Sequence, residues 1–293
     1  MRIRLWFLTL LLSVLILFAG CDFLLDLFPD SEQPAAAGDD SNALFGYPSK
    51  GSSRTQLIER DAYTLLFSYD DLTPVWVSWH IDGGDMGTGR KADFKGDPDV
   101  PDEYRLYKDD YTNSGFDRGH VCPNADRNNN DKEQQETFYM TNIVPQNPMN
   151  NQQTWQDLEE YLQGLAENNS EVYIIAGPAG VGGYDENGDY REAIETTVDR
   201  KTVEITVPEY VWKVALIMNN DNNDLERAEE IGGCSPLAVI MPNRDTTDRH
   251  WSKYVCTIDD VEKLTGFDFF SELDDSVEAD IESDLFEYVS FGS

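Results

Sequence analysis

The apolar residues of this chain fall mostly into short runs bounded by glycine, proline, asparagine or aspartate. Residues 63–69 (YTLLFSY) and 75–80 (VWVSWH) are aromatic and β-branched and are parted by Asp-Asp-Leu-Thr-Pro, a pattern typical of a β-hairpin. Similar runs predict further strands at 137–144, 172–176, 203–207, 211–218, 237–241 and 254–258. The pattern therefore predicts many short strands.

Helical periodicity is strongest in residues 151–167. The apolar residues there recur at steps of three and four: Trp155, Leu158, Leu162 and Leu165. This spacing places them on one apolar stripe of a helix. Residues 259–264 predict a second, short helix that Gly266 closes. Many strands with few helices predict an α+β body around a mostly antiparallel sheet.

The N-terminus predicts export. A short basic start is followed by an apolar run, residues 5–20, which is an export signal and too short for a stop-transfer helix. Small residues directly before Cys21 also resemble a bacterial lipobox, in which the cysteine is lipidated and becomes the first residue of the mature protein. We therefore predict an export signal over residues 1–20 and a lipid on Cys21, with simple secretion and a plain membrane anchor as the alternatives.

Residues 21–54 are rich in aspartate, serine, alanine and glycine and have little periodic apolar pattern. This composition predicts a flexible, acidic tether that begins at the lipidated cysteine. Residues 55–293 are long enough to form one sizeable domain with its own core. The expected location is a membrane-anchored lipoprotein facing the periplasm or the cell exterior, or a secreted protein.

The net charge is −34, from 56 acidic and 22 basic residues. Acidity on this scale favours solubility outside the cell and opposes nonspecific adhesion to polyanions. Phosphate binding normally depends on lysine and arginine. A nucleic-acid function would therefore rely on a few local cations, helped by a metal ion.

Three cysteines follow Cys21. Cys234 and Cys256 lie near the ends of two strand-like runs, so a disulfide between them is one interpretation in an exported protein. That bridge would leave Cys122 unpaired. Three buried thiols are the other interpretation, and the sequence leaves both open.

The stretch FDRGHVCPNADR, residues 116–127, carries candidate chemistry. His120 is one of three histidines in the chain, and imidazole can take a proton from water near neutral pH. Arg118 is always charged, and its planar fork suits phosphate oxygens. Gly119 between them would let the backbone approach a ligand closely. Taken alone, the stretch fits a structural histidine, held by backbone hydrogen bonds, about as well.

Asn151 and Glu159 add a second group of candidates. Asn151 stands at the start of the predicted helix, and Glu159 lies eight positions later, which is two turns plus about 80° of rotation in an α-helix. The two side chains are then expected on neighbouring parts of one surface. An amide oxygen and a carboxylate, with waters completing the shell, suit Mg²⁺. A helix N-cap and a solvated carboxylate are the alternatives.

Together these segments resemble the DNA/RNA non-specific endonucleases. The matching segments, in chain order, are FDRGHVCPNADR, TFYMTNIVPQNPMNNQQTWQDLEEYL, VYIIAGPAG, VPEYVWKV and VEKLTGFDFF. The resemblance runs from about residue 63 to the last helix, and the combination of DRGH with a downstream N-x₃-W-x₃-E is highly specific. It implies the ββα-metal (His-Me finger) fold, in which a hairpin strand carries the histidine and the following helix carries the metal ligand.

The resemblance also implies roles for individual residues. It implies that His120 is the general base, that Asn151 is the direct Mg²⁺ ligand, and that Glu159 orients the waters of the metal. Arg118 corresponds to an arginine that supports the active site and its phosphate. Arg90, in a glycine-rich loop upstream, is the candidate for a further arginine that faces the phosphate.

One position departs from the family pattern. Family members usually carry an arginine four residues after the helix glutamate, and this chain has Gln163 there. Residues four apart share a helix surface. The missing cation therefore predicts weaker phosphate affinity, with the metal–histidine chemistry unchanged.

The resemblance implies a Mg²⁺-dependent, sugar-nonspecific endonuclease, with Mn²⁺ as a substitute metal, that hydrolyses DNA and RNA to 5′-phosphate products. Low sequence selectivity is expected because backbone contacts position a substrate without specifying its sequence. The alternative is a catalytically weakened, surface-exposed binding module of the same fold, motivated by the acidity and by Gln163. Beyond nucleic acids, and a membrane reached through the lipid, the sequence indicates no partner.

Overall fold

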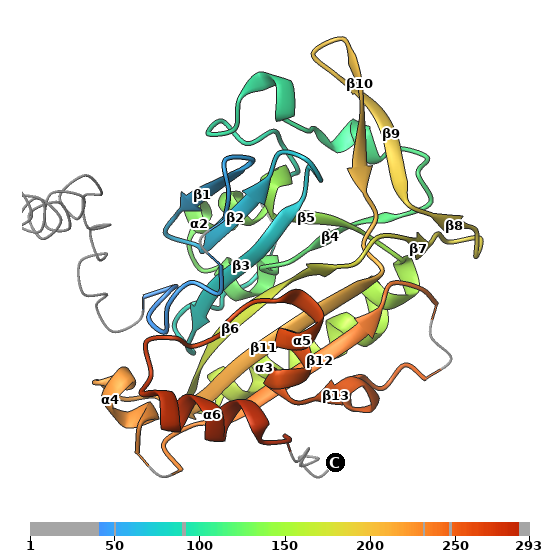
Figure 1. The fold of residues 1–293 in the computed structure, drawn as a ribbon. Helices are drawn as coiled ribbons and strands as arrows, with labels where there is room; N and C mark the ends of the chain where they lie inside the picture. The colour runs from blue at the N-terminus through green and yellow to red at the C-terminus, as the bar shows by residue number, and fades with distance from the viewer. Residues whose placement is uncertain (1–40, 50, 90–91, 231, 246–247, 287–293) are drawn as a thin grey trace, which may run out of the picture. The chain divides into compact units, whose positions relative to one another are not determined.

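An antiparallel sheet of seven strands forms the centre of the folded body (Figure 1), and its strand order is β1-β2-β3-β6-β11-β12-β13. The strands are β1 (Thr55–Glu59), β2 (Thr64–Ser68), β3 (Pro74–Ile81), β6 (Ser170–Ala179), β11 (Tyr210–Asn219), β12 (Ser235–Pro242) and β13 (Val255–Cys256). The computed structural model describes residues 41–49, 51–89, 92–230, 232–245 and 248–286. All of these residues belong to one unit, Asp39–Ser293.

Smaller elements surround this sheet. Three two-stranded ribbons pair β4 (Asp117–His120) with β5 (Ile143–Gln146), β7 (Gly183–Tyr184) with β8 (Tyr190–Arg191), and β9 (Ala193–Val198) with β10 (Lys201–Thr206). The α-helices are α2 (Asp131–Thr137), α3 (Gln156–Glu167), α4 (Asp224–Ala228), α5 (Ile258–Thr265) and α6 (Asp275–Ser283). A π-helical turn, η5 (Asn150–Trp155), precedes α3 directly. Short 3-10 turns are η1 (Asp102–Tyr104), η2 (Lys108–Tyr111), η3 (Asn124–Arg127), η4 (Met140–Asn142) and η6 (Trp251–Tyr254).

The central sheet is buried on both faces. Successive residues of one strand enter different hydrophobic clusters: Leu65 belongs to one cluster and Leu66 to the other. This follows from the alternation of side chains along a strand. Helix α3 contributes Leu158 to the first cluster, whereas α5 contributes Val261 to the second. The two helices therefore cover opposite faces of the sheet, as Figure 1 shows.

Most of the predicted elements are confirmed. The predicted hairpin is β2 and β3, and the runs at 172–176, 203–207, 211–218 and 237–241 coincide with β6, β10, β11 and β12. The second predicted helix is α5, and Gly266 ends it with a φ of 73°. This left-handed conformation favours glycine.

The strand predicted at 137–144 is wrong over most of its length. Helix α2 ends at Thr137, the turn η4 follows, and β5 begins only at Ile143. Phe138 and Met140 are buried, at 0% and 1% exposure, but they pack at the end of a helix and in a turn. The run is apolar because its residues are buried. A short apolar run does not by itself distinguish a strand from other buried backbone.

The predicted boundary between tether and domain, at residues 54 and 55, is also wrong. Leu44 and Phe45 are buried in the second cluster, and the Phe45 ring lies 4.8 Å from the ring of Tyr173 in β6. Asn42 donates hydrogen bonds to the carbonyl oxygens of Arg60 and Asp61. The folded body therefore includes residues 41–49, because two apolar residues in a polar, glycine-rich segment were enough to dock it.

The predicted export signal and the predicted lipid site, Cys21, lie outside the described residues. Within the described part of the chain, every helix is too short or too polar to cross a membrane.

The disulfide interpretation is contradicted, since Cys122, Cys234 and Cys256 are all free thiols. Cys256 pairs with Ala238 across β12 and β13, and Cys234 stands four positions before Ala238 in the chain. At about 3.3 Å per residue this separates the two cysteine Cα atoms by roughly 13 Å, whereas a bridge requires less than about 7 Å. Burial raises the pKa of Cys234 to about 11 and that of Cys256 to about 12.

Candidate active site

The DRGH segment forms β4, one strand of a short hairpin that leads into a helix. Asp117 pairs with Gln146 of β5, and His120 pairs with Ile143. The chain then passes through η5 into α3. Hairpin and helix together make a ββα unit, which brings His120 into one substructure with Asn151, 31 residues later, and with Glu159, 39 residues later.

Gly119 is needed for packing inside this unit. A Cβ atom on Gly119 would lie 2.8 Å from the Cβ of Gln146 and closer still to its Oε1. Gln146 is buried at 1% exposure, and its Nε2 donates a 2.5 Å hydrogen bond to Oδ1 of Asn150 at the start of η5. The glycine therefore makes room for a side chain of the neighbouring strand, and the expected close approach of a ligand is not its reason.

Arg118 and His120 lie on the same face of β4 because they are two residues apart. The ring of Phe94 contacts both: its centroid is 5.1 Å from that of the His120 ring and 5.1 Å from Cζ of Arg118. Phe138 packs edge-to-face on His120 at 4.7 Å. Arg118 also donates from Nη1 to the carbonyl oxygen of Lys108, at 3.1 Å. Two aromatic rings and one carbonyl thus fix where the imidazole and the guanidinium lie.

The backbone that follows His120 is held by Asn142. Its Nδ2 donates to the carbonyl oxygens of Cys122 and Thr137, and its Oδ1 accepts from the N–H of Cys122. Arg127, buried at 3% exposure, donates to the carbonyl oxygens of Ala62 and Asp126. Both residues stabilise the loop between the histidine and α2 by hydrogen bonding.

Asn151 does not cap the helix. It is the second residue of η5, whose N-terminal flanking residue is Met149. Its Nδ2 donates a 2.8 Å hydrogen bond to Oδ2 of Asp117, and Gln152 donates to the same oxygen at 2.8 Å. Asp117 therefore fixes the amide so that Oδ1, the atom able to bind a cation, points away from the carboxylate.

The π-helical turn also changes the relation of Asn151 to Glu159. A π-helix bonds residue i to i+5, so each residue turns less than in an α-helix. The total rotation between the two residues is then smaller than the 80° beyond two turns that a regular α-helix predicts. Asn151 and Glu159 consequently lie more nearly on one line along the helix than expected. Isolated π-turns of this kind are frequent at functional sites.

Glu159 faces a buried lysine. Its Oε1 lies 3.9 Å from Nζ of Lys213 on β11, and the side chains are 15% and 1% exposed. The Lys213 ammonium lies over the rings of Trp155 at 4.4 Å and Trp79 at 5.4 Å. Burial raises the pKa of Glu159 to about 8, and the charge of Lys213 opposes that rise. Burial lowers the pKa of Lys213, against the carboxylates of Glu159 and Asp126.

Gln163, the position that departs from the family pattern, points inward. Its Nε2 donates a 2.7 Å hydrogen bond to Oδ1 of the buried Asp126, whose other oxygen accepts from Nε1 of Trp79 at 2.8 Å. Burial raises the pKa of Asp126, and Lys213 and these two donors lower it. The amide thus belongs to the polar layer beneath Glu159, which already contains one cation, Lys213.

The donor set of the site fits a hard divalent cation. Asn151 offers an amide oxygen, and Glu159 offers a carboxylate whose Oε1 faces the Lys213 ammonium at 3.9 Å. The charge of Lys213 offsets only part of the cost of burial, since the pKa of Glu159 is still raised to about 8, so a further cation would stabilise the carboxylate. Oxygen ligands combined with water are what Mg²⁺ takes in proteins.

Arg90, the candidate phosphate-facing arginine, lies outside the described residues. Lys213 was missed by the sequence reasoning, although a lysine inside the apolar run VWKVALIM is a recognisable signal of a buried charge. Asp117 stands in the DRGH motif, which assigned it no role, and Phe94 carried no signal of its own.

A histidine on a hairpin strand, followed by an amide and a carboxylate on the next helix, is the arrangement that defines the ββα-metal nucleases. Residues 40–276 match the profile of the DNA/RNA non-specific endonuclease family. The chain belongs to this family and is an endonuclease.

Relatives and a solved structure agree with this assignment. A nuclease of Nostoc sp. is 31% identical over 262 residues, which cover 89% of this chain and 88% of that protein. The mitochondrial nuclease EXOG of Xenopus laevis is 30% identical, over 87% of this chain and 70% of its own length. A chain from the crystal structure of an EndoG/EndoGI complex superposes with a TM-score of 0.63 at 24% identity, over 83% of this chain and 95% of that chain. This last likeness supports the fold.

Proposed function

We propose that this endonuclease uses Mg²⁺ and a histidine general base to hydrolyse the phosphodiester bonds of both DNA and RNA, leaving 5′-phosphate products. The observation that carries the proposal is the 2.8 Å hydrogen bond between Asn151 and Asp117. This hydrogen bond holds Asn151, the residue best suited to bind the ion, against β4, the strand that also carries His120. Base and metal ligand are thereby fixed relative to each other.

The four candidate residues have different parts in the proposed mechanism. His120 takes the proton from the attacking water, and the two aromatic rings around it keep the imidazole in place. Arg118 supplies positive charge to the phosphate oxygens. Asn151 would hold the ion directly, and Glu159 would accept hydrogen bonds from the ion's waters. The bound ion supplies positive charge to the scissile phosphate and to the leaving 3′-oxygen.

Activity on both DNA and RNA follows from the kind of contact involved. The assigned residues act on a phosphate, a water and a cation, and such contacts carry no sequence information. The acidic surface, with a net charge of −34, adds no general attraction for polyanions. We therefore expect substrate affinity to fall steeply as salt rises.

The test is cleavage of plasmid DNA and of RNA by the full-length chain. Mg²⁺ should support cleavage of both, EDTA should stop it, and His120→Ala should lower the rate by about 10²–10⁴-fold. His250→Ala, a change in an exposed histidine outside the ββα unit, is the matched control and should retain activity. Cleavage that survives His120→Ala would refute the assigned base. Products that a ligase cannot rejoin without prior phosphorylation would refute the 5′-phosphate assignment.

We also propose that the protein is exported and held at a membrane through a lipid on Cys21, or else secreted. The basic start, the apolar run and the small residues before Cys21 support this. Cys21→Ser should release the protein from the membrane fraction. Equal membrane association of both forms would contradict a lipid anchor.

A further inference from the structure

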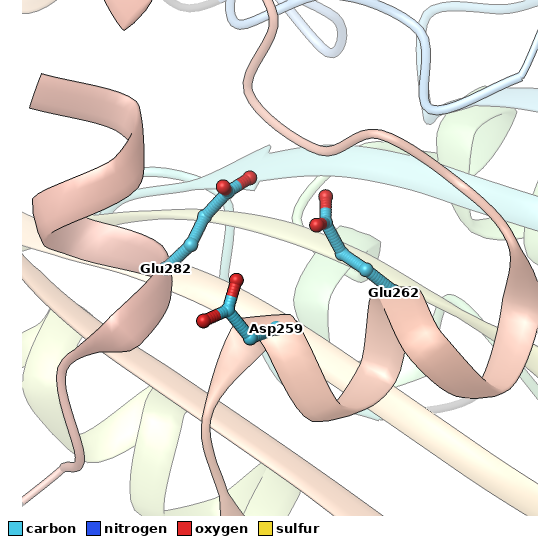
Figure 2. A group of neighbouring side chains, drawn as sticks. All are labelled: Asp259, Glu262 and Glu282. Atoms are coloured by element: carbon cyan, nitrogen blue, oxygen red, sulfur yellow. The ribbon is translucent and has the colours of Figure 1, made fainter. Parts of the chain in front are cut away.

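Five carboxylates gather where α6 packs on α5, on the face of the sheet opposite to α3. They are Asp259 and Glu262 on α5, Asp268 in the following loop, and Glu278 and Glu282 on α6. One oxygen each of Asp259, Glu262 and Glu282 lie within 4.8 Å of one another. Figure 2 shows these three side chains extending from the two helices toward one another. In the described part of the chain, none of the five forms an ion pair with a lysine or arginine.

Glu282 distinguishes this cluster from an ordinary acidic surface. The residue is only 8% exposed, and its Oε1 is enclosed with no hydrogen-bond partner among the described residues. Oε1 of Glu278, one turn earlier on α6, is enclosed in the same way. A buried carboxylate that lacks both a donor and a cation destabilises the fold. The helix nevertheless directs Glu282 toward two more carboxylates.

The arrangement places like charges together. Burial first, then the charge of Glu262 and a hydrogen bond with it, and then the charges of Glu278 and Asp259 raise the pKa of Glu282. Glu262 has one backbone donor, the N–H of Phe269 at 2.9 Å from Oε1, which fixes its direction. Asp259, Glu262 and Glu282 thus bring three carboxylate oxygens within the reach of one cation.

We propose that Asp259, Glu262 and Glu282 form a second metal site, which binds a divalent cation of the Ca²⁺ type and fastens α6 to α5. Ca²⁺ binds its oxygen ligands at about 2.4 Å. Two ligand oxygens on opposite sides of one such ion therefore lie up to about 4.8 Å apart. Exposed Asp259 would leave room for waters to complete the shell. Asp268 and Glu278 also have oxygens within 4.8 Å of one of Glu282, and they add negative potential. The site lies apart from the catalytic unit, so it does not depend on the proposed function.

The experiment measures Ca²⁺ binding in a full-length chain that carries Asn151→Ala, so that the catalytic ligand is removed. Calorimetric titration should give one Ca²⁺ per chain, and saturating Ca²⁺ should raise Tm by about 5 °C over NaCl of equal ionic strength. Glu282→Gln, nearly isosteric, should abolish this rise and should itself raise Tm in EDTA because it removes the buried carboxylate. Asp280→Asn, an exposed carboxylate on the same helix, should leave the rise unchanged.

Two further variants keep the test decisive. Asp259→Asn should weaken Ca²⁺ binding at least about tenfold, whereas Asp268→Asn should leave it within about threefold. The reverse order would overturn the assigned ligands. Absence of a Ca²⁺-specific rise in the Asn151→Ala background, or a rise that Glu282→Gln does not change, would overturn the site itself. Nuclease activity is a separate readout, so neither result bears on the catalytic proposal.

Discussion

The ammonium nitrogen of Lys213 lies 3.9 Å from Oε1 of Glu159 and 4.4 Å above the ring of Trp155. A central strand of the sheet thus places a buried cation directly beneath α3, the helix that carries Glu159, a proposed partner of the metal-bound waters. The pair is asymmetric, since Lys213 is fully enclosed and Glu159 reaches the surface at 15% exposure. This geometry makes Lys213 a candidate positioning residue whose charge favours the ionised form of the buried Glu159 carboxylate.

Lys213→Met should therefore change the pH dependence of the reaction. Methionine keeps the apolar stem and removes the charge that favours ionised Glu159, so the pKa of Glu159 should rise above its present value of about 8. At neutral pH activity should fall at least about tenfold, and the acid limb of kcat/KM should move to higher pH. Breaking a buried pair should also lower the free energy of unfolding by about 3 kcal/mol.

The double variant Lys213→Met/Glu159→Gln separates stability from catalysis. It removes both charges of the pair, and the buried carboxylate of Asp126 keeps its hydrogen bonds from Trp79 and Gln163, so stability should recover in part while activity stays low. An acid limb that does not move in Lys213→Met would show that the lysine is merely a packing residue.

Asp117→Ala should weaken the metal site without touching the base. Asn151 loses the acceptor that orients its amide, so the apparent Mg²⁺ affinity should fall about 10–100-fold, as is typical when the partner of a metal ligand is removed. The rate at saturating Mg²⁺ should fall less. Gln152→Ala removes the second donor to Asp117 and serves as the control, because it leaves the Asn151 bond in place. A fall in the maximal rate alone would contradict this role.

Gly119→Ala should destabilise the hairpin. The new methyl group would collide with Gln146, which is buried and bonded to Asn150, at a cost of about 1–3 kcal/mol in the free energy of unfolding. Chemical denaturation measures this loss. Combining it with Gln146→Ala removes the collision and should restore much of the stability. Equal stability of the single and double variants would mean that the clash is absorbed elsewhere.

Glu282 should couple the stability of the metal-free protein to pH. Its pKa is about 8 in the folded state against 4.5 as the ordinary value, so between these values the folded state binds the proton that the unfolded chain releases. Its contribution is fully present below pH 4.5 and is lost as the pH rises through 8. In EDTA, Tm should fall between pH 5 and 9, and less so in Glu282→Gln. Parallel curves for the two proteins would contradict the coupling.

The sequence predicts the central sheet well because its strands are buried on both faces and read as continuous apolar runs. The apolar run at Phe138 and Met140 does not correctly predict a strand, since these residues are buried at a helix end and in a turn. At Leu44 and Phe45 the sequence predicts a flexible tether, but both residues are buried in the second hydrophobic cluster. Two apolar residues are too few to produce a periodic signal, although they suffice to dock a segment.

The sequence proposes members of the site by residue type, but it does not indicate the residues that support them. The chemistry proposed for His120, Asn151 and Glu159 follows from a motif because it depends on those residue types. Lys213 and Asp117 act through contacts across 54 and 34 positions of the chain, and only the fold reveals such pairings. The π-turn that realigns Asn151 is equally invisible, since its residues have the composition of an ordinary helix start.

Phe94 is the single ring that contacts both Arg118 and His120 among the described residues. The glycine-rich stretch before it, from Asp82 to Gly89, contacts the loop after β4 instead, through the ion pair of Asp85 with Arg127 and the hydrogen bond from the N–H of Gly87 to Asn128. A change that removes the Phe94 ring should therefore release the guanidinium and the imidazole together, whereas a change that keeps the ring should leave their alignment intact.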